Sequence, residues 1–173
     1  MRLYGSKVSA LAQEIVRELT SSKAIEVDDA HAQREVVADV ESVLRNYLET
    51  ERIVDGKTRD LLQKTGRGAS EFGRVRQQIA EHHGIKVGDD ALDHLLDQVV
   101  AMLMHSSHVD EVFAEDVDLR RQMRPIFRRY MAIDSDIDTE VRAQLKHVRE
   151  GTPQWDFEYA RALESVKRKR GLS

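Results

Sequence analysis

Apolar residues along the chain recur at spacings of three and four, which is the period of a helix with one buried face. The pattern is clearest near the start of the chain, in Val8, Leu11, Ile15 and Leu19. The segment from Val36 to Leu48 repeats it. Its valines favour strands, but strict alternation of apolar and polar residues is absent. We therefore expect an all-α protein.

Capping residues divide the first half of the chain into separate predicted helices. A side-chain oxygen at a helix start accepts hydrogen bonds from the free amides of the first turn. We expect such caps at Ser6, at Asp28 or Asp29, and at Ser70. Before the helix that Ser70 caps, a short helix is predicted from about Asp55 to Lys64, ending at Gly66.

The helical pattern restarts near Asp89 and Asp90, either of which is expected to cap a helix that runs to about Leu103. A longer and less regular apolar stretch follows, and it contains Pro125. Proline has no amide hydrogen to donate to the preceding turn. We therefore expect a kink or a break near this residue.

The final part of the chain is predicted to hold two more helices. Asp136 or Asp138 is expected to cap the first of them, which ends at Gly151. Thr152-Pro153 is expected to start the second, because proline at the first helical position loses no intrahelical hydrogen bond.

The second half of the chain can be laid over the first. The overlay pairs Leu19 with Leu103, Tyr47 with Tyr130, and Phe72 with Trp155. Unrelated helical segments share a period but seldom share turn glycines and aromatic positions as well. We therefore predict two tandem repeats of three to four helices each, residues 1–86 and 87–173, packed as a compact helical bundle that behaves as one cooperative unit.

The composition fits a protein that folds in water. Apolar residues make up 40% and charged residues 34% of the chain, with two prolines and nine glycines. The absence of cysteine excludes disulfides and thiolate metal sites and suits a reducing cytosol. The start of the chain lacks the apolar core of a signal peptide, and the longest apolar run, Val99 to Met104, is too short to span a membrane. We expect a cytoplasmic protein without membrane contact.

Basic residues form the strongest candidate contact surface, although the net charge of −4 opposes a dedicated nucleic-acid binder. Arg120, Arg124 and Arg128 recur at every fourth residue and so form a stripe on one helix face. The basic tail comprises Lys167, Arg168, Lys169 and Arg170. Both groups suit phosphate contact. The alternative is that the arginines pair with acidic residues, such as those of segment 111–118, and that the tail is solvated.

Histidines are the strongest candidate metal ligands in the chain. They are His82, His83, His94, His105 and His108, with carboxylates nearby. His94 and His105 share a helix face but lie three turns apart, roughly 16 Å, which is too far for one ion. We expect solvated histidines near helix ends and no metal or cofactor. The paired aspartates fall at predicted helix starts, where capping explains them. No phosphate-binding loop or serine-nucleophile motif occurs, so we expect no catalytic residues.

The end of the second predicted repeat carries a recognisable motif. An acidic turn precedes an I-D-x-x-V-R helix, and a G-x-x-x-W-D-x-x-Y helix closes the chain. With the opening Met1-Arg2-Leu3, this order resembles the bacterial domain-of-unknown-function family numbered 507. The motif positions are Val141, Arg142, Trp155, Asp156 and Tyr159. The longer members look like two-unit proteins of similar length, so the resemblance covers the whole chain. It departs in the loop before Trp155, which is shortened, and it implies no activity.

No residue pattern in the sequence specifies a reaction or a ligand. We therefore expect a non-enzymatic helical scaffold or adaptor that binds another protein, and the sequence also allows a homo-oligomer. The alternative is an RNA- or DNA-associated protein that uses the arginine stripe and the basic tail. Trp155 is expected to be a buried core anchor of its repeat rather than a ligand platform.

Overall fold

The computed structural model describes residues 2–172, and nearly all of them are helical. The helices are α1 (Val8–Ser21), α2 (Ala30–Thr65), α3 (Phe72–His82), α4 (Ala91–His105), α5 (Asp116–Met131), α6 (Ile133–Gln144) and α7 (Pro153–Lys169). Two-residue strands β1 (Ile25–Glu26) and β2 (Glu111–Val112) pair antiparallel, with Ile25 opposite Val112. The prediction of an all-α protein is confirmed.

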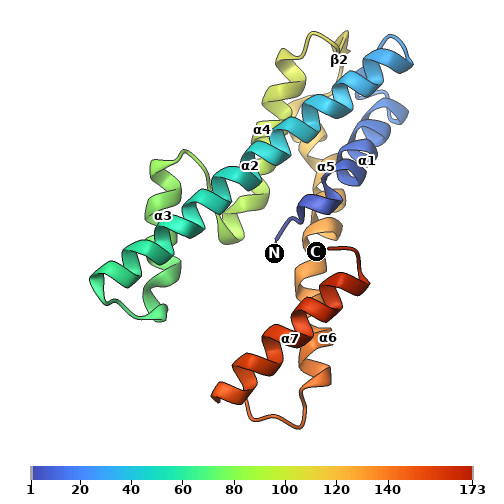
Figure 1. Cartoon of the computed structure of the whole chain (residues 1–173). Coiled ribbons are helices and arrows are strands. Elements are labelled where there is room, and N and C mark those ends of the chain that lie inside the picture. The colour runs from blue at the N-terminus through green and yellow to red at the C-terminus, as the bar shows by residue number, and fades with distance from the viewer. Residues whose placement is uncertain (1, 173) are drawn as a thin grey trace.

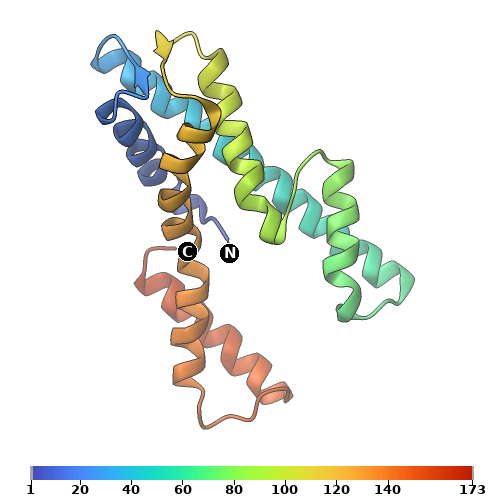
Figure 2. The ribbon, with the colours of Figure 1, turned by 180° about the vertical axis from the view of Figure 1, so that it is seen from behind.

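The helices form a central bundle from which two arms diverge (Figure 1). The central bundle consists of α1, the first part of α2, α4 and α5, which pack on one another. The first arm is the rest of α2 with α3, and the second arm is α6 with α7. Both chain ends lie where the arms diverge, and the view from behind shows the same separation (Figure 2).

Two separate hydrophobic cores hold the molecule together. The larger one lies in the central bundle, where Leu11, Leu95 and Phe127 are fully buried. It draws on both predicted halves of the chain, because α1 and α2 pack against α4 and α5. The smaller core lies in the second arm and contains Ile137, Val141, Leu145 and Val166, together with Tyr4 and Leu172. The compact bundle expected from the sequence therefore describes the central part only.

Helix α2 corrects the prediction of two helices over this stretch. It is one helix of 36 residues, and it ends as predicted at Gly66, which has a φ of 64°. Its buried positions continue through Val54, Thr58 and Leu62 at helical spacing, so the apolar face is never interrupted. Asp29 caps its start as predicted, because its carboxylate accepts from the backbone amide of Ala32 at 2.7 Å.

Several predicted helix boundaries are wrong. Ser6 and Ser70 lie in short 3₁₀ turns and make no capping bond to the helices that follow. Asp136 and Asp138 lie inside α6 and do not cap it. The reason is that the α5 stretch stays helical to Met131, so α6 follows almost directly at Ile133 and ends at Gln144, before Gly151.

The start of α7 and the course of α5 show how proline acts in two settings. Thr152 caps α7 as predicted, since its hydroxyl accepts from the amide of Trp155 at 3.2 Å and Pro153 takes the first helical position. Pro125 remains inside α5, and the helix ends only at Met131. Pro125 is exposed, so water can reach the backbone carbonyl that the missing amide leaves unpaired.

Candidate functional site

The histidines expected near helix ends lie in different environments. His94 is buried against Tyr47, with ring centroids 5.9 Å apart, and burial lowers its pKa. His83 follows the last residue of α3, with its Nε2 atom 3.0 Å from Lys57 Nζ. Between residues 2 and 172, no group of three histidine, aspartate or glutamate side chains is placed so that it could hold a metal ion. The expectation of solvated histidines is wrong for His94, because its helix face points into the central core.

A cluster of serine, histidine and aspartate lies where the loop after α4 meets α2, and sequence motifs did not indicate it. Asp39 Oδ2 accepts from the Ser106 hydroxyl at 3.0 Å and lies 3.2 Å from His108 Nδ1. In a nucleophilic triad, the imidazole stands between the hydroxyl and the carboxylate. Here both groups bind the same carboxylate oxygen, so the imidazole is not placed to take the serine proton. The cluster ties the loop to α2.

The arginine stripe on α5 is largely engaged within the chain. Arg124 pairs with Asp93 at 2.6 Å, and Arg120 pairs with Asp97. Both aspartates belong to α4, one helix away in the central bundle. Arg128 is exposed and forms no ion pair among the described residues. The stripe therefore binds α4 through two of its three members and leaves one guanidinium toward water.

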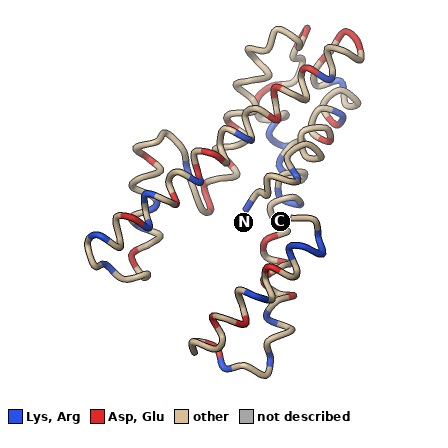
Figure 3. The backbone as a smooth tube through the Cα atoms, viewed as in Figure 1, with Lys and Arg blue, Asp and Glu red and all other residues tan. Residues whose placement is uncertain are grey.

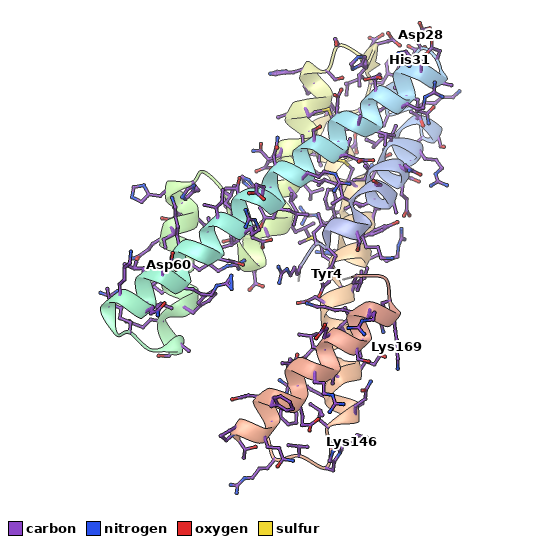
Figure 4. All side chains as sticks on the ribbon, viewed as in Figure 1. Tyr4, Asp28, His31, Asp60, Lys146 and Lys169 are labelled. Atoms are coloured by element: carbon purple, nitrogen blue, oxygen red, sulfur yellow. The ribbon has the colours of Figure 1, made fainter. Side chains whose placement is uncertain are left out.

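The basic tail closes α7 and is also partly engaged. Arg170 pairs with Glu140 of α6 at 2.7 Å, and Arg168 pairs with Glu164 at 3.2 Å. The ammonium group of Lys167 lies 5.6 Å from the centre of the Tyr4 ring. Lys169 lies on the outer side of the second arm, away from the first arm (Figure 4). Acidic and basic positions are interspersed along the backbone of the bundle and of both arms (Figure 3).

A groove of about 530 Å³ opens at the point where the arms diverge, and we call it the apex groove. Its lining comes from the segment before α1 and from the middle of α2: Arg2, Leu3, Tyr4, Gly5, Arg45, Asn46, Leu48, Glu49, Glu51 and Arg52. Cationic and anionic side chains edge it, and Leu48, which is half-buried, supplies apolar surface above the buried Leu3. The apex groove is thus suited to an amphipathic surface rather than to a single charged group.

Next to the apex groove, a partly buried ionic network that includes the groove residue Glu51 ties the first arm together. Arg76 of α3 pairs with Asp55 at 2.6 Å and with Glu51 at 3.0 Å. Burial raises the pKa of Glu51, although the charge of Arg76 opposes that rise. Each charge of this network has a partner, which is the condition under which burial of ions is tolerated. We therefore interpret this network as one that stabilises the wall of the apex groove.

The family-motif residues build the second arm. Tyr159 donates its hydroxyl to Asp138 at 2.5 Å, and Arg142 pairs with the same aspartate at 2.9 Å. Val141 is fully buried between α6 and α7, whereas Asp156 is exposed. These contacts hold α7 against α6 and present no free reactive group.

Trp155 differs from the prediction of a buried anchor. It is half-buried, with its ring 6.1 Å from that of Tyr159 and 5.7 Å from the guanidinium of Arg142. The second arm is only two helices thick, so no third layer covers the outer side of the ring. Phe157, on the opposite face of α7 from Val166, is 68% exposed.

Together, the fold and these contacts define a predominantly helical protein with an open apex groove, in which most arginines are paired within the chain. None of the helices between residues 2 and 172 is long and apolar enough to cross a membrane. Residues 1–172 match the family described as "Protein of unknown function (DUF507)", and the chain belongs to that family. No curated protein matches the chain in sequence.

Proposed function

We propose that this protein is a non-enzymatic helical scaffold or adaptor that binds another protein in the cytoplasm. The observation that carries the proposal is the pairing of Arg120 and Arg124 with the carboxylates of α4. Charges that are neutralised within the chain contribute little to phosphate binding. One feature that remains open to a macromolecule is the pair of diverging arms with the apex groove where they meet.

The apex groove supports a protein partner by its composition. Interfaces between proteins combine an apolar centre with a polar rim and are enriched in arginine. Leu48 supplies the apolar part, and Arg2 and Arg45 lie among the lining residues. A second copy of the chain is one possible partner, and light scattering at increasing concentration distinguishes it from a foreign protein.

Affinity capture from a lysate of the source cells tests the proposal, with and without nuclease and at about 0.1 and about 0.5 M salt. We expect a partner that survives both treatments and is lost with Asn46→Arg, because Asn46 is exposed and a longer cationic side chain there fills the apex groove. The matched control is Gln78→Arg, at an exposed position of α3. Capture that disappears with nuclease, or no specific capture, refutes the adaptor.

Nucleic-acid binding is the second candidate function, supported by Arg128 and Lys169. Both are exposed, and neither forms an ion pair among the described residues. Titrations with duplex DNA and single-stranded RNA at several salt concentrations test it in the wild type and in a variant with Arg120, Arg124 and Arg128 changed to Gln. Salt-dependent wild-type binding at micromolar affinity or tighter that collapses in the variant would favour this function over the adaptor.

We also infer that the chain arose from two copies of one helical unit. Elements recur in the order helix, short strand, long helical stretch and closing helix in residues 8–82 and again in 91–169. Further support comes from the arms: Arg76 of α3 binds Asp55 of α2, and in the second arm Tyr159 of α7 binds Asp138 of α6. Superposition of the halves should place Arg76 on Tyr159, and a fit that puts them in unrelated positions would contradict duplication.

A further inference from the structure

A second groove, about 500 Å³ in volume, runs between α1 and the start of α2, and we call it the hairpin groove. Gln13 and Arg17 of α1 line one side, and Ala30, Gln33, Arg34 and Val37 of α2 line the other. The two helices pack side by side at this end of the bundle (Figure 1). Figure 4 marks the nearby start of α2 by Asp28 and His31.

The polar side chains of the hairpin groove form no direct hydrogen bond or ion pair within residues 2–172, although the charges of Arg17 and Arg34 help to lower the pKa of Glu14 and of Asp29 respectively. The side chains of Gln13, Arg17, Gln33 and Arg34 take part in none of the hydrogen bonds or ion pairs between side chains in the described part of the chain. Elsewhere in the molecule most arginines have a carboxylate partner, as Arg76 and Arg124 do. Two free guanidinium groups on facing helices therefore distinguish this groove.

The carboxylates nearest to the hairpin groove form no hydrogen bond or ion pair with Arg17 or Arg34 in the described part of the chain. Glu14 binds Arg129 of α5, and the charge and hydrogen bond of that guanidinium lower the pKa of Glu14 even though burial opposes the shift. Asp29 is occupied as the cap of α2, where the amide of Ala32 lowers its pKa. Glu18 lies with Glu14 and Arg17 along a neighbouring hollow. The donors of Arg17 and Arg34 thus remain available to a ligand.

We propose that the hairpin groove binds an acidic segment of a partner protein, an inference that rests on the proposed adaptor function. Guanidinium groups bind carboxylates with strong, directional hydrogen bonds. Val37 adds half-buried apolar surface that suits a side chain between two carboxylates of the partner.

The test is a titration followed by NMR, in which the side-chain amides of Gln13 and Gln33 report directly on the groove. The probe is a synthetic peptide of about twelve residues, with glutamates at i, i+4 spacing and leucines between them. We expect saturable shifts of both glutamine amides and a roughly tenfold loss of affinity in a variant with Arg17→Glu and Arg34→Glu. A variant with Arg149→Glu and Arg161→Glu is the matched control, since both arginines are exposed on the second arm and neither forms an ion pair among the described residues.

Three results would overturn the proposal. They are no shifts of the glutamine amides, equal loss of affinity in the control variant, or stronger shifts with a single-stranded oligonucleotide of similar charge. The last result would assign the groove to nucleic acid. A partner that is captured equally by the wild type and by the Arg17→Glu, Arg34→Glu variant would leave the adaptor function standing while refuting this groove as its binding site.

Discussion

Tyr4 fastens the second arm to the central bundle, and its hydroxyl offers a sharp test of how the arms are held. The hydroxyl donates to Asp134 Oδ1 at 2.7 Å, joining the segment before α1 to the first turn of α6. The ring is 7% exposed and belongs to the second-arm core, while the Arg2 amide donates to the Met131 carbonyl at 3.3 Å. Together with the α5–α6 junction and with Lys167, whose ammonium group lies 5.6 Å from the centre of the Tyr4 ring, these contacts tie this arm to the bundle.

Tyr4→Phe removes the hydroxyl and leaves the ring in place. A hydrogen bond to a charged group contributes about 1.5–3 kcal/mol. Asp134 is half-exposed, and water therefore replaces part of the lost bond, so we expect about 1–2 kcal/mol. Since the second arm has a core of its own, the cost should fall on opening of this arm rather than on unfolding of the whole chain.

Hydrogen exchange read by mass spectrometry measures local opening. A free-energy change of about 1.4 kcal/mol alters an equilibrium constant tenfold. Tyr4→Phe should therefore make the second arm open more often and speed amide exchange in α6 and α7 by roughly fivefold to thirtyfold. Exchange in α4 and in the α5 residues around Phe127 should not change, since they belong to the larger core. Equal acceleration in the central bundle, or none in α6 and α7, would refute the idea that the arm opens separately.

Tyr47→Phe is the matched control. Its hydroxyl donates to the Lys86 carbonyl at 3.0 Å, so its loss should affect the region around α2 and α3 and leave α6 and α7 unchanged. Alkaline pH gives an independent check, because burial and the bond to Asp134 raise the pKa of Tyr4 to about 12. A raised pKa in the folded state means that the stabilisation is complete below about pH 10 and is lost as pH rises through the folded value. In Tyr4→Phe, the part of the alkaline loss of stability that comes from ionisation of the Tyr4 hydroxyl should be absent.

Further predictions concern single side chains in the bundle and the arms. Gly56→Ala should raise the free energy of unfolding by about 0.5–1 kcal/mol in urea titrations, because Gly56 lies inside α2 and an added Cβ meets nothing within 4 Å. Loss of stability would show that the helix is not continuous there. His94 has a pKa lowered by burial, so the unfolded state takes up the proton first and stability should fall as pH drops below about 6.5. In His94→Gln, the free energy of unfolding should fall less steeply with decreasing pH. An unchanged pH dependence would contradict the attribution of that fall to His94. Trp155→Ala should cost about 1.5–3 kcal/mol, below the range for a fully buried aromatic, with native fluorescence between those of buried and exposed tryptophan. A larger cost with blue-shifted emission would restore the buried anchor expected from the sequence.

Local features of the fold were readable from the sequence because they depend on neighbouring residues. Apolar spacing predicts that a segment is helical and which face it buries. The caps at Asp29 and Thr152 and the end of α2 at Gly66 also depend on only a few residues of chain. The same holds for the family motif around Trp155, which was recognised from residue order alone and agrees with the family match.

Helix ends were predicted less well where a continuing apolar face outweighed a local signal. Ser6 and Ser70 are good capping residues by type, but the chain forms 3₁₀ turns there and its helices begin later. The stretch around Gly56 stays helical because Val54 and Thr58 remain buried against α3 and the bundle. Tertiary packing of this kind stabilises a helix more than the conformational preference of one residue destabilises it.

Partners distant in the chain were decided by the tertiary structure alone. Periodicity places Arg120 and Arg124 on one face, yet it cannot say that α4 presents aspartates to that face. Likewise, Tyr4 meets Asp134, a residue 130 positions away, only because the arms diverge beside the start of α1. The sequence by itself determined that these segments are helical and, for most of them, which face is buried. The crossing of those helices decided which charges are paired and which, such as Arg17, remain free, because that depends on three-dimensional packing rather than on spacing along the chain.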